Sequence, residues 1–181
     1  MVRSRYSAIL TAAHAVETKA RARQAKAIFS AVGAHPRRVV ALDPDRLFVS
    51  CAPRVDVAVV ALAADVARAP PPLYRGDPHN PPRQWLTFWH HGGGAPRMRL
   101  GGGPLVVMVQ DSFVLNVRSV PGASGSAIFT ANWELYGILA AEAHAYASLL
   151  RRHTMTRVTE GCLLAPLLEA LQRRQLRLAC K

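Results

Sequence analysis

The stretch VPGASGSAIF, residues 120–129, places a cluster of small residues between two apolar segments. Glycine and serine together usually mark a turn. The residues before the cluster, SFVLNV, and those after it, AIF and LYGILA, are apolar and include many strand-forming side chains. The pattern therefore predicts that Ser124 lies on a tight turn that is held by a β-sheet.

A serine on such a turn raises the question of nucleophilic chemistry. A hydroxyl becomes a good nucleophile when a base removes its proton, and a carboxylate improves that base by fixing its tautomer. The sequence offers His14 in LTAAH and Asp56 at the start of the apolar run VDVAVVAL. The amides of Gly122 and Ser124 can converge on one point, as a developing oxyanion requires. Each feature is common alone, and their order and context together favour a hydrolase.

Three segments carry a resemblance to a known family. LTAAHAV, DVAVVAL and PGASGSAIF resemble the hallmark segments of trypsin-like serine proteases, in the chain order His, Asp, Ser. GASGSAIFTANWELYGILA is most similar to the HtrA/Deg-like and the viral or bacterial branches. The resemblance extends over about residues 4–171. It implies an all-β fold of two packed six-stranded antiparallel barrels, with the active site between them.

The resemblance also implies roles for individual residues. His14 would be the general base and Asp56 its orienting partner. Ser124 would be the nucleophile, with an oxyanion hole formed by the amides of Gly122 and Ser124. The implied function is a serine endopeptidase that hydrolyses polypeptides through an acyl-enzyme, without a metal or another cofactor.

Substrate contacts follow from the same resemblance. The strand Gly137 to Glu142, with Ala140 and Ala141, would form the edge to which an extended substrate adds as another strand. Arg118 lies six residues before Ser124, where family members often place a residue at the base of the specificity pocket. An inward Arg118 would favour an acidic or small substrate residue, whereas an outward Arg118 would be solvated.

The sequence departs from the family pattern in several places. Ala123 replaces the usual Asp or Asn, and Ser126 with Ala127 replaces the usual Gly-Pro. Only 13 residues precede His14, whereas the family has one or two further strands there. We therefore expect an incomplete first barrel with an exposed sheet edge. A fragment, a misplaced start, a degenerate copy and a protein completed by a partner remain open.

The chain is expected to form one peptidase domain. Lobe one covers about residues 1–66, a proline-rich connector about 67–83, and lobe two about 84–164. Pro166 and the helical spacing of the leucines after it predict an amphipathic C-terminal helix over about residues 166–178.

The charge of the chain bears on the alternatives to an active protease. The 23 Lys and Arg residues outnumber the 11 Asp and Glu residues, which favours weak attraction to nucleic acid. Two alternatives to an active protease follow: an inactive or fragmentary protease-like domain that binds peptides or protein partners, and a basic nucleic-acid-binding domain in which the triad is coincidental. His90 and His91 are adjacent, so in a strand they point to opposite sides and do not form a metal site.

Cysteine usage and hydropathy bear on the compartment. Three cysteines without a C-x-x-C pair favour a reducing compartment. No apolar run reaches the roughly 18 to 20 residues that span a bilayer. The basic, acid-poor start also has features of a targeting segment. The sequence therefore favours an intracellular location without excluding an organelle or secretion.

Overall fold

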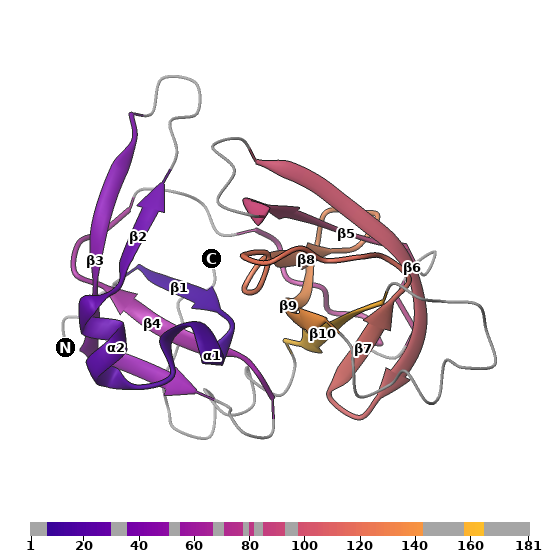
Figure 1. Ribbon diagram of the computed structural model, residues 1–181, viewed down its shortest axis with the longest axis horizontal. Coiled ribbons are helices and arrows are strands. Elements are labelled where there is room, and N and C mark those ends of the chain that lie inside the picture. Colours follow the sequence, from indigo (N-terminus) through magenta and orange to yellow (C-terminus); the bar gives the residue numbers. More distant parts are fainter. Residues whose placement is uncertain are drawn as a thin grey trace.

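The computed structural model describes residues 7–29, 36–50, 55–66, 71–77, 80–81, 85–92, 98–142 and 158–164. These residues form two β-structured lobes that lie side by side (Figure 1). The first lobe contains β1–β4 with two short helices, and the second contains β5–β10. The chain is therefore mostly β, as predicted.

Lobe one is a curled half-barrel rather than a closed barrel. Its elements are β1 (Ala8–Thr11), α1 (Ala13–Val16), α2 (Lys19–Gln24), β2 (Lys26–Phe29), β3 (Arg38–Ser50) and β4 (Ala58–Leu62). The antiparallel strands have the order β1-β4-β3-β2. The apolar run AVVAL forms β4, which is wholly buried because it lies between two other strands. Within the described ranges, β1 and β2 are the edges of this sheet.

Lobe two is a closed barrel. Its strands are β5 (Trp85–His90), β6 (Arg99–Val109), β7 (Ser112–Leu115), β8 (Ala127–Phe129), β9 (Leu135–Glu142) and β10 (Thr159–Leu163), in the order β10-β7-β6-β5-β8-β9. The fully buried Phe113 ring packs inside it. A Cβ at Gly161 would lie 2.6 Å from Cε2 of this ring, so the close approach of β10 requires glycine.

A shared hydrophobic cluster joins the lobes. Lobe one contributes buried side chains from β3, from β4 and from the segment that leads into β4, and lobe two contributes side chains from β9, from β10 and from the residue that follows β10. The buried members are Leu47, Val49, Val55, Val57, Val59, Ala61, Leu135, Ile138, Ala140, Cys162 and Leu164. We call this set the interface cluster. Because its members come from both lobes, burial of apolar surface fixes one lobe against the other.

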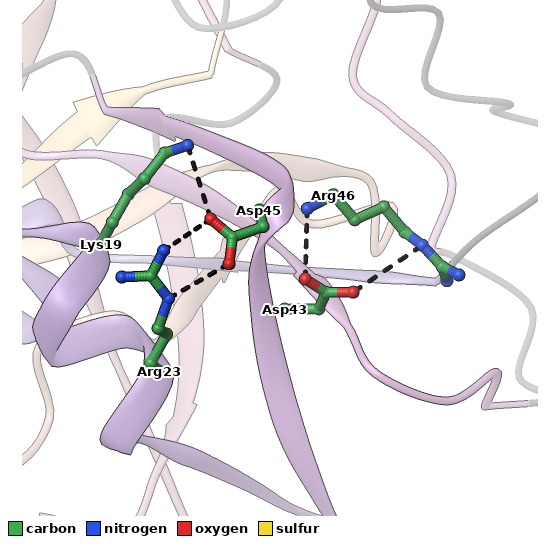
Figure 2. A network of polar contacts seen from close by, with 5 residues as sticks. All are labelled: Lys19, Arg23, Asp43, Asp45 and Arg46. Atoms are coloured by element: carbon green, nitrogen blue, oxygen red, sulfur yellow. Dashed lines mark hydrogen bonds and ion pairs between the residues drawn. The ribbon is translucent and has the colours of Figure 1, made fainter.

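Helix α2 is attached to β3 by polar contacts (Figure 2). The Thr18 hydroxyl accepts a hydrogen bond from the Arg21 amide and caps the helix. The Arg23 guanidinium donates from Nε and Nη2 to the two carboxylate oxygens of Asp45, at 3.1 and 2.6 Å. Lys19 Nζ lies 4.0 Å from the same carboxylate. These contacts hold α2 on the outside of the half-barrel.

Of the four expectations about the fold, one is wrong, one is confirmed and two remain predictions. The described residues contain one closed barrel and one half-barrel, so the expectation of two six-stranded barrels is wrong, and that of an incomplete first lobe is confirmed. The predicted helix over about 166–178 lies outside the described residues, which contain no long helix. The lobe boundaries stay predictions, although Leu73 of the connector forms a parallel bridge with Leu135.

Candidate active site

His14 and Asp56 meet because β1 and β4 pair. Thr11, at the end of β1, pairs with Ala58, at the start of β4. The chain turns into α1 directly after β1, and His14 therefore lies beside the residues that precede β4. The His14 amide donates to Asp56 Oδ1 at 2.8 Å, and Asp56 Oδ2 lies 2.5 Å from His14 Nδ1.

This double contact defines the state of the imidazole. A carboxylate only accepts hydrogen bonds, so His14 Nδ1 carries the proton and Nε2 is the nitrogen available as a base. The side chain of His14 is 50% exposed and that of Asp56 is 28% exposed. The buried residues Val55 and Val57 flank the carboxylate. Solvent can thus reach the imidazole, while Asp56 is partly shielded.

Ser124 lies on a turn held at three points. The Ala123 amide donates to the Val120 carbonyl at 3.0 Å, and the Ser126 amide donates to the Ala123 carbonyl at 3.1 Å. The Gly125 amide donates to the Leu139 carbonyl of β9 at 2.7 Å. Ala123, where the family usually has Asp or Asn, is fully buried, so its small side chain fits beneath the turn.

The backbone of this turn needs glycine at two positions. Gly122 has a φ of 85° and Gly125 a φ of 84°, in the region that side chains with a Cβ rarely adopt. Within the described structure, the amides of Gly122 and Ser124 donate to no acceptor. Gly122 is exposed and Ser124 half-buried, so both amides are available to a ligand oxygen.

The Ser124 turn packs against the segment that carries His14. A Cβ at Gly125 would lie 2.6 Å from Thr11 Oγ1 and 3.2 Å from the Ala12 nitrogen. The residue after Ser124 therefore contacts the residues just before α1. The described structure contains no hydrogen bond between Ser124 and His14. Such bonds are often long in unliganded enzymes and shorten when a substrate is bound.

Within the described residues, the strand predicted to bind substrate has a neighbouring strand on both sides over part of its length and on one side over the rest. Gly137 pairs with Ile128 of β8 on one side and with Leu163 of β10 on the other. Among the described strands, Ala141 and Glu142 pair with β10 alone, and Ala140 lies between these two regions. An added strand would therefore meet Ala140–Glu142 rather than Gly137.

Arg118 is exposed to solvent. This position agrees with the solvated alternative for its side chain.

Among the described residues, no three His, Cys, Asp or Glu side chains form a group that could hold a metal ion, and His90 and His91 are therefore in no such group. The described chain also contains no helix long and apolar enough to cross a membrane.

Cys162 is a part of the site that sequence reasoning missed. It lies on β10 in lobe two, is 2% exposed, and shares the interface cluster with Val55 and Val57. Burial raises the pKa of the Cys162 thiol to about 11, and hydrogen bonding by the Asp56 backbone opposes that rise. Lobe two thus supports the segment that presents Asp56. No local sequence signal identifies this contact, because residues 56 and 162 meet only through tertiary packing.

The comparisons with known proteins show the family of this chain. A model of the trypsin-like peptidase domain family matches residues 1–138. This range contains His14, Asp56 and Ser124, and the chain belongs to that family. A sequence comparison with curated proteins gave no match.

Solved structures of proteases share the fold. The serine endoprotease from Yersinia pestis has a TM-score of 0.64 and 15% identity, over 98% of this chain and 56% of that chain. A Glu endopeptidase has a TM-score of 0.65 and 14% identity, over 97% of this chain and 84% of that chain. A human pathogenic astrovirus serine protease has a TM-score of 0.53 and 12% identity, over 90% and 81% of the two chains.

The match to the family model confirms the resemblance at the level of the family, and the solved structures confirm the fold. This chain spans little more than half of the length of the Yersinia protein. The Yersinia protease and the Glu endopeptidase match it about equally well. The comparisons therefore do not distinguish the HtrA/Deg-like branch from the others.

Proposed function

We propose that the protein is a serine endopeptidase in which Ser124 is the nucleophile, His14 the general base and Asp56 its orienting partner. The observation that carries this proposal is the double contact from His14 to Asp56, 2.8 Å from the amide and 2.5 Å from Nδ1. It leaves His14 Nε2 as the available base. The turn of Ser124 contacts the segment just before this histidine.

The proposed reaction has two halves. In the first, Ser124 Oγ attacks a peptide carbonyl carbon while its proton passes to His14 Nε2. The carbonyl oxygen becomes an oxyanion that accepts hydrogen bonds from the amides of Gly122 and Ser124. Collapse of this intermediate breaks the C–N bond, and the imidazolium gives its proton to the leaving amine. In the second half, water attacks the acyl-enzyme by the same route and releases the acid.

Substrate is proposed to bind as an added strand beside Ala140, Ala141 and Glu142. Within the part of the chain that the structure describes, Ala141 and Glu142 pair with β10 alone, which supports this placement. Main-chain hydrogen bonds would supply affinity that depends little on side chains. The exposed Arg118 would select acidic substrate residues only by long-range attraction, so charge reversal by Arg118→Glu tests its role.

Labelling with a fluorophosphonate tests the nucleophile. We expect one covalent adduct on Ser124, which Ser124→Ala abolishes. The matched control is Ser126→Ala, since Ser126 is a half-buried serine on the same turn whose backbone makes its hydrogen bonds with Ala123 and Leu139. Labelling of Ser126→Ala should equal that of the unaltered protein. A folded protein that gives no adduct would favour a domain that binds peptides without cleaving them.

The role of the carboxylate has its own test. Asp56→Asn keeps the size of the side chain but permits the wrong imidazole tautomer, and the expected slowing of labelling is roughly 10³- to 10⁴-fold. The measurement is the second-order rate constant of labelling at pH 8, alongside His14→Ala. A rate for Asp56→Asn within threefold of the unaltered protein would contradict the assignment.

Because the net charge is +12, nucleic-acid binding is an alternative function, and the same variants can test it. If the protein binds mixed-sequence DNA with an affinity that falls steeply with salt, and gives no adduct, the basic-domain alternative gains support. An equal affinity of Ser124→Ala would then separate DNA binding from the candidate site.

A further inference from the structure

His90, at the end of β5, contacts the Ser124 turn through one intervening residue. Its ring lies against Phe88, with centroids 5.6 Å apart, and Phe88 is 1% exposed. The ring is therefore held by the core of lobe two. His90 is half-buried, and the proposed reaction does not use it.

The imidazole of His90 accepts a hydrogen bond from the backbone. The Gly92 amide donates to His90 Nδ1 at 3.0 Å. An amide nitrogen only donates, so Nδ1 carries no proton, and the neutral ring holds its proton on Nε2. Protonation of Nδ1 would replace this hydrogen bond by a repulsion between two donors.

Gly92 in turn packs against the start of the Ser124 turn. Gly92 is buried, and a Cβ at this position would overlap the Val120 side chain. The Val120 carbonyl accepts the hydrogen bond of the Ala123 amide at 3.0 Å. This bond closes the turn from which Gly122 and Ser124 present their amides. A continuous set of contacts therefore links His90 to the candidate oxyanion hole.

We propose that His90 is a positioning residue for the oxyanion hole: its unprotonated Nδ1 holds Gly92 against Val120 and so fixes the turn at Gly122 and Ser124. This proposal rests on the proposed protease function for its catalytic consequence. The contact itself does not depend on activity. Protonation of His90 releases Gly92 and loosens the turn, which makes the turn sensitive to acid.

The surroundings of His90 favour the neutral ring. Arg99 is its partner across the β5–β6 pair, and His91 is its neighbour in the chain. The Ser124 turn approaches Gly92, the hydrogen-bond partner of His90, through the apolar side chain of Val120. Burial lowers the pKa of His90 below its usual value, and the charges of Arg99 and His91 lower it further. The hydrogen bond to Gly92 is therefore intact at neutral pH.

Two variants of matched shape test the role of the acceptor. His90→Asn places Oδ1 where Nδ1 lies and cannot be protonated, whereas His90→Leu has the same branched shape without an acceptor. At pH 8, the rate of fluorophosphonate labelling of Ser124 should fall about three- to tenfold in His90→Leu, as expected for one lost hydrogen bond. His90→Asn should stay within twofold of the unaltered protein.

The pH profile separates positioning from a merely structural role. Below neutral pH, protonation of His90 should lower the rate of the unaltered protein, whereas His90→Asn lacks this contribution because the Asn side chain cannot be protonated. The ratio of the His90→Asn rate to the unaltered rate should therefore rise as the pH falls. A ratio that stays constant with pH, or equal rates for His90→Leu and His90→Asn, would overturn the proposal.

Nuclear magnetic resonance gives a readout without catalysis. In Ser124→Ala protein, ¹⁵N shifts should show His90 with Nε2 protonated and Nδ1 unprotonated at neutral pH. The amide shifts of Gly92 and Gly122 should follow the titration of His90. A protonated Nδ1 at neutral pH would overturn the proposal. If the unaltered protein gives no adduct, the protease function fails, and these shifts still decide whether His90 positions the turn.

Discussion

At the scale of single residues, the site depends on close approaches that leave no room for extra atoms. Gly125 is the clearest case, since its φ of 84° and its contact with Thr11 both exclude a side chain. The glycines around Ser124 already predicted a strained turn, because only glycine adopts such a φ without cost. The contact with Thr11 was not predictable, because it joins residues more than 100 positions apart.

Gly125→Ala tests this contact. The added Cβ would lie 2.6 Å from Thr11 Oγ1, and the φ strain alone should cost about 1–3 kcal/mol. We expect a lower free energy of unfolding, measured by urea denaturation, and slower labelling of Ser124. The double variant Thr11→Ala/Gly125→Ala removes the hydroxyl and should recover part of both losses. No recovery, with Thr11→Ala alone neutral, would show that steric contact with Thr11 is not the cause.

At the scale of elements, pairing of β1 with β4 sets the site, and the α2 contacts support the half-barrel from outside. The apolar runs that form β1 and β4 were readable as strands. The pairing of β1 with β4 was not predictable, because it joins strands that are far apart in the sequence, and the apolar pattern of a strand does not identify its neighbour.

The Arg23–Asp45 contact (Figure 2) lowers the pKa of Asp45, mainly through the hydrogen bond from Arg23, while burial opposes this effect.

The sign of this pKa shift gives a prediction. The pKa of Asp45 is lower in the folded than in the unfolded chain, so the contact stabilises the fold at pH values above the ordinary carboxyl pKa of 3.8. Its contribution is lost as the pH falls through the lower, folded pKa. Asp45→Asn should reduce the melting temperature slightly at pH 7, because the pair is exposed, and not at the acid limit. An equal reduction at both pH values would contradict this account.

At the scale of the whole molecule, the interface cluster makes the two lobes one unit. Family resemblance predicted two lobes with the site between them. The cluster itself was not predictable, since apolar strand residues do not reveal which ones face another lobe. Cys162 illustrates this, because its contact with the Asp56 segment exists only in the folded molecule.

Leu47→Ala tests whether the lobes unfold together. Leu47 is a lobe-one member of the interface cluster and is 4% exposed. Its truncation should lower the free energy of unfolding by about 2–5 kcal/mol. Hydrogen exchange should then quicken equally at the buried amides of β4 and of β7, although β7 is in lobe two. Leu100→Ala, at a position 53% exposed, should change little. Faster exchange confined to β4 would show that the lobes unfold separately.

The most direct test of the proposed triad is a crystal structure of the protein after reaction with a fluorophosphonate. We predict a covalent bond from Ser124 Oγ to phosphorus, a phosphoryl oxygen within hydrogen-bonding distance of the amides of Gly122 and Ser124, and His14 Nε2 facing Ser124 Oγ. The contacts of His14 with Asp56 should persist at 2.8 and 2.5 Å. An adduct on another residue, or a His14 ring turned away from Ser124, would contradict the account.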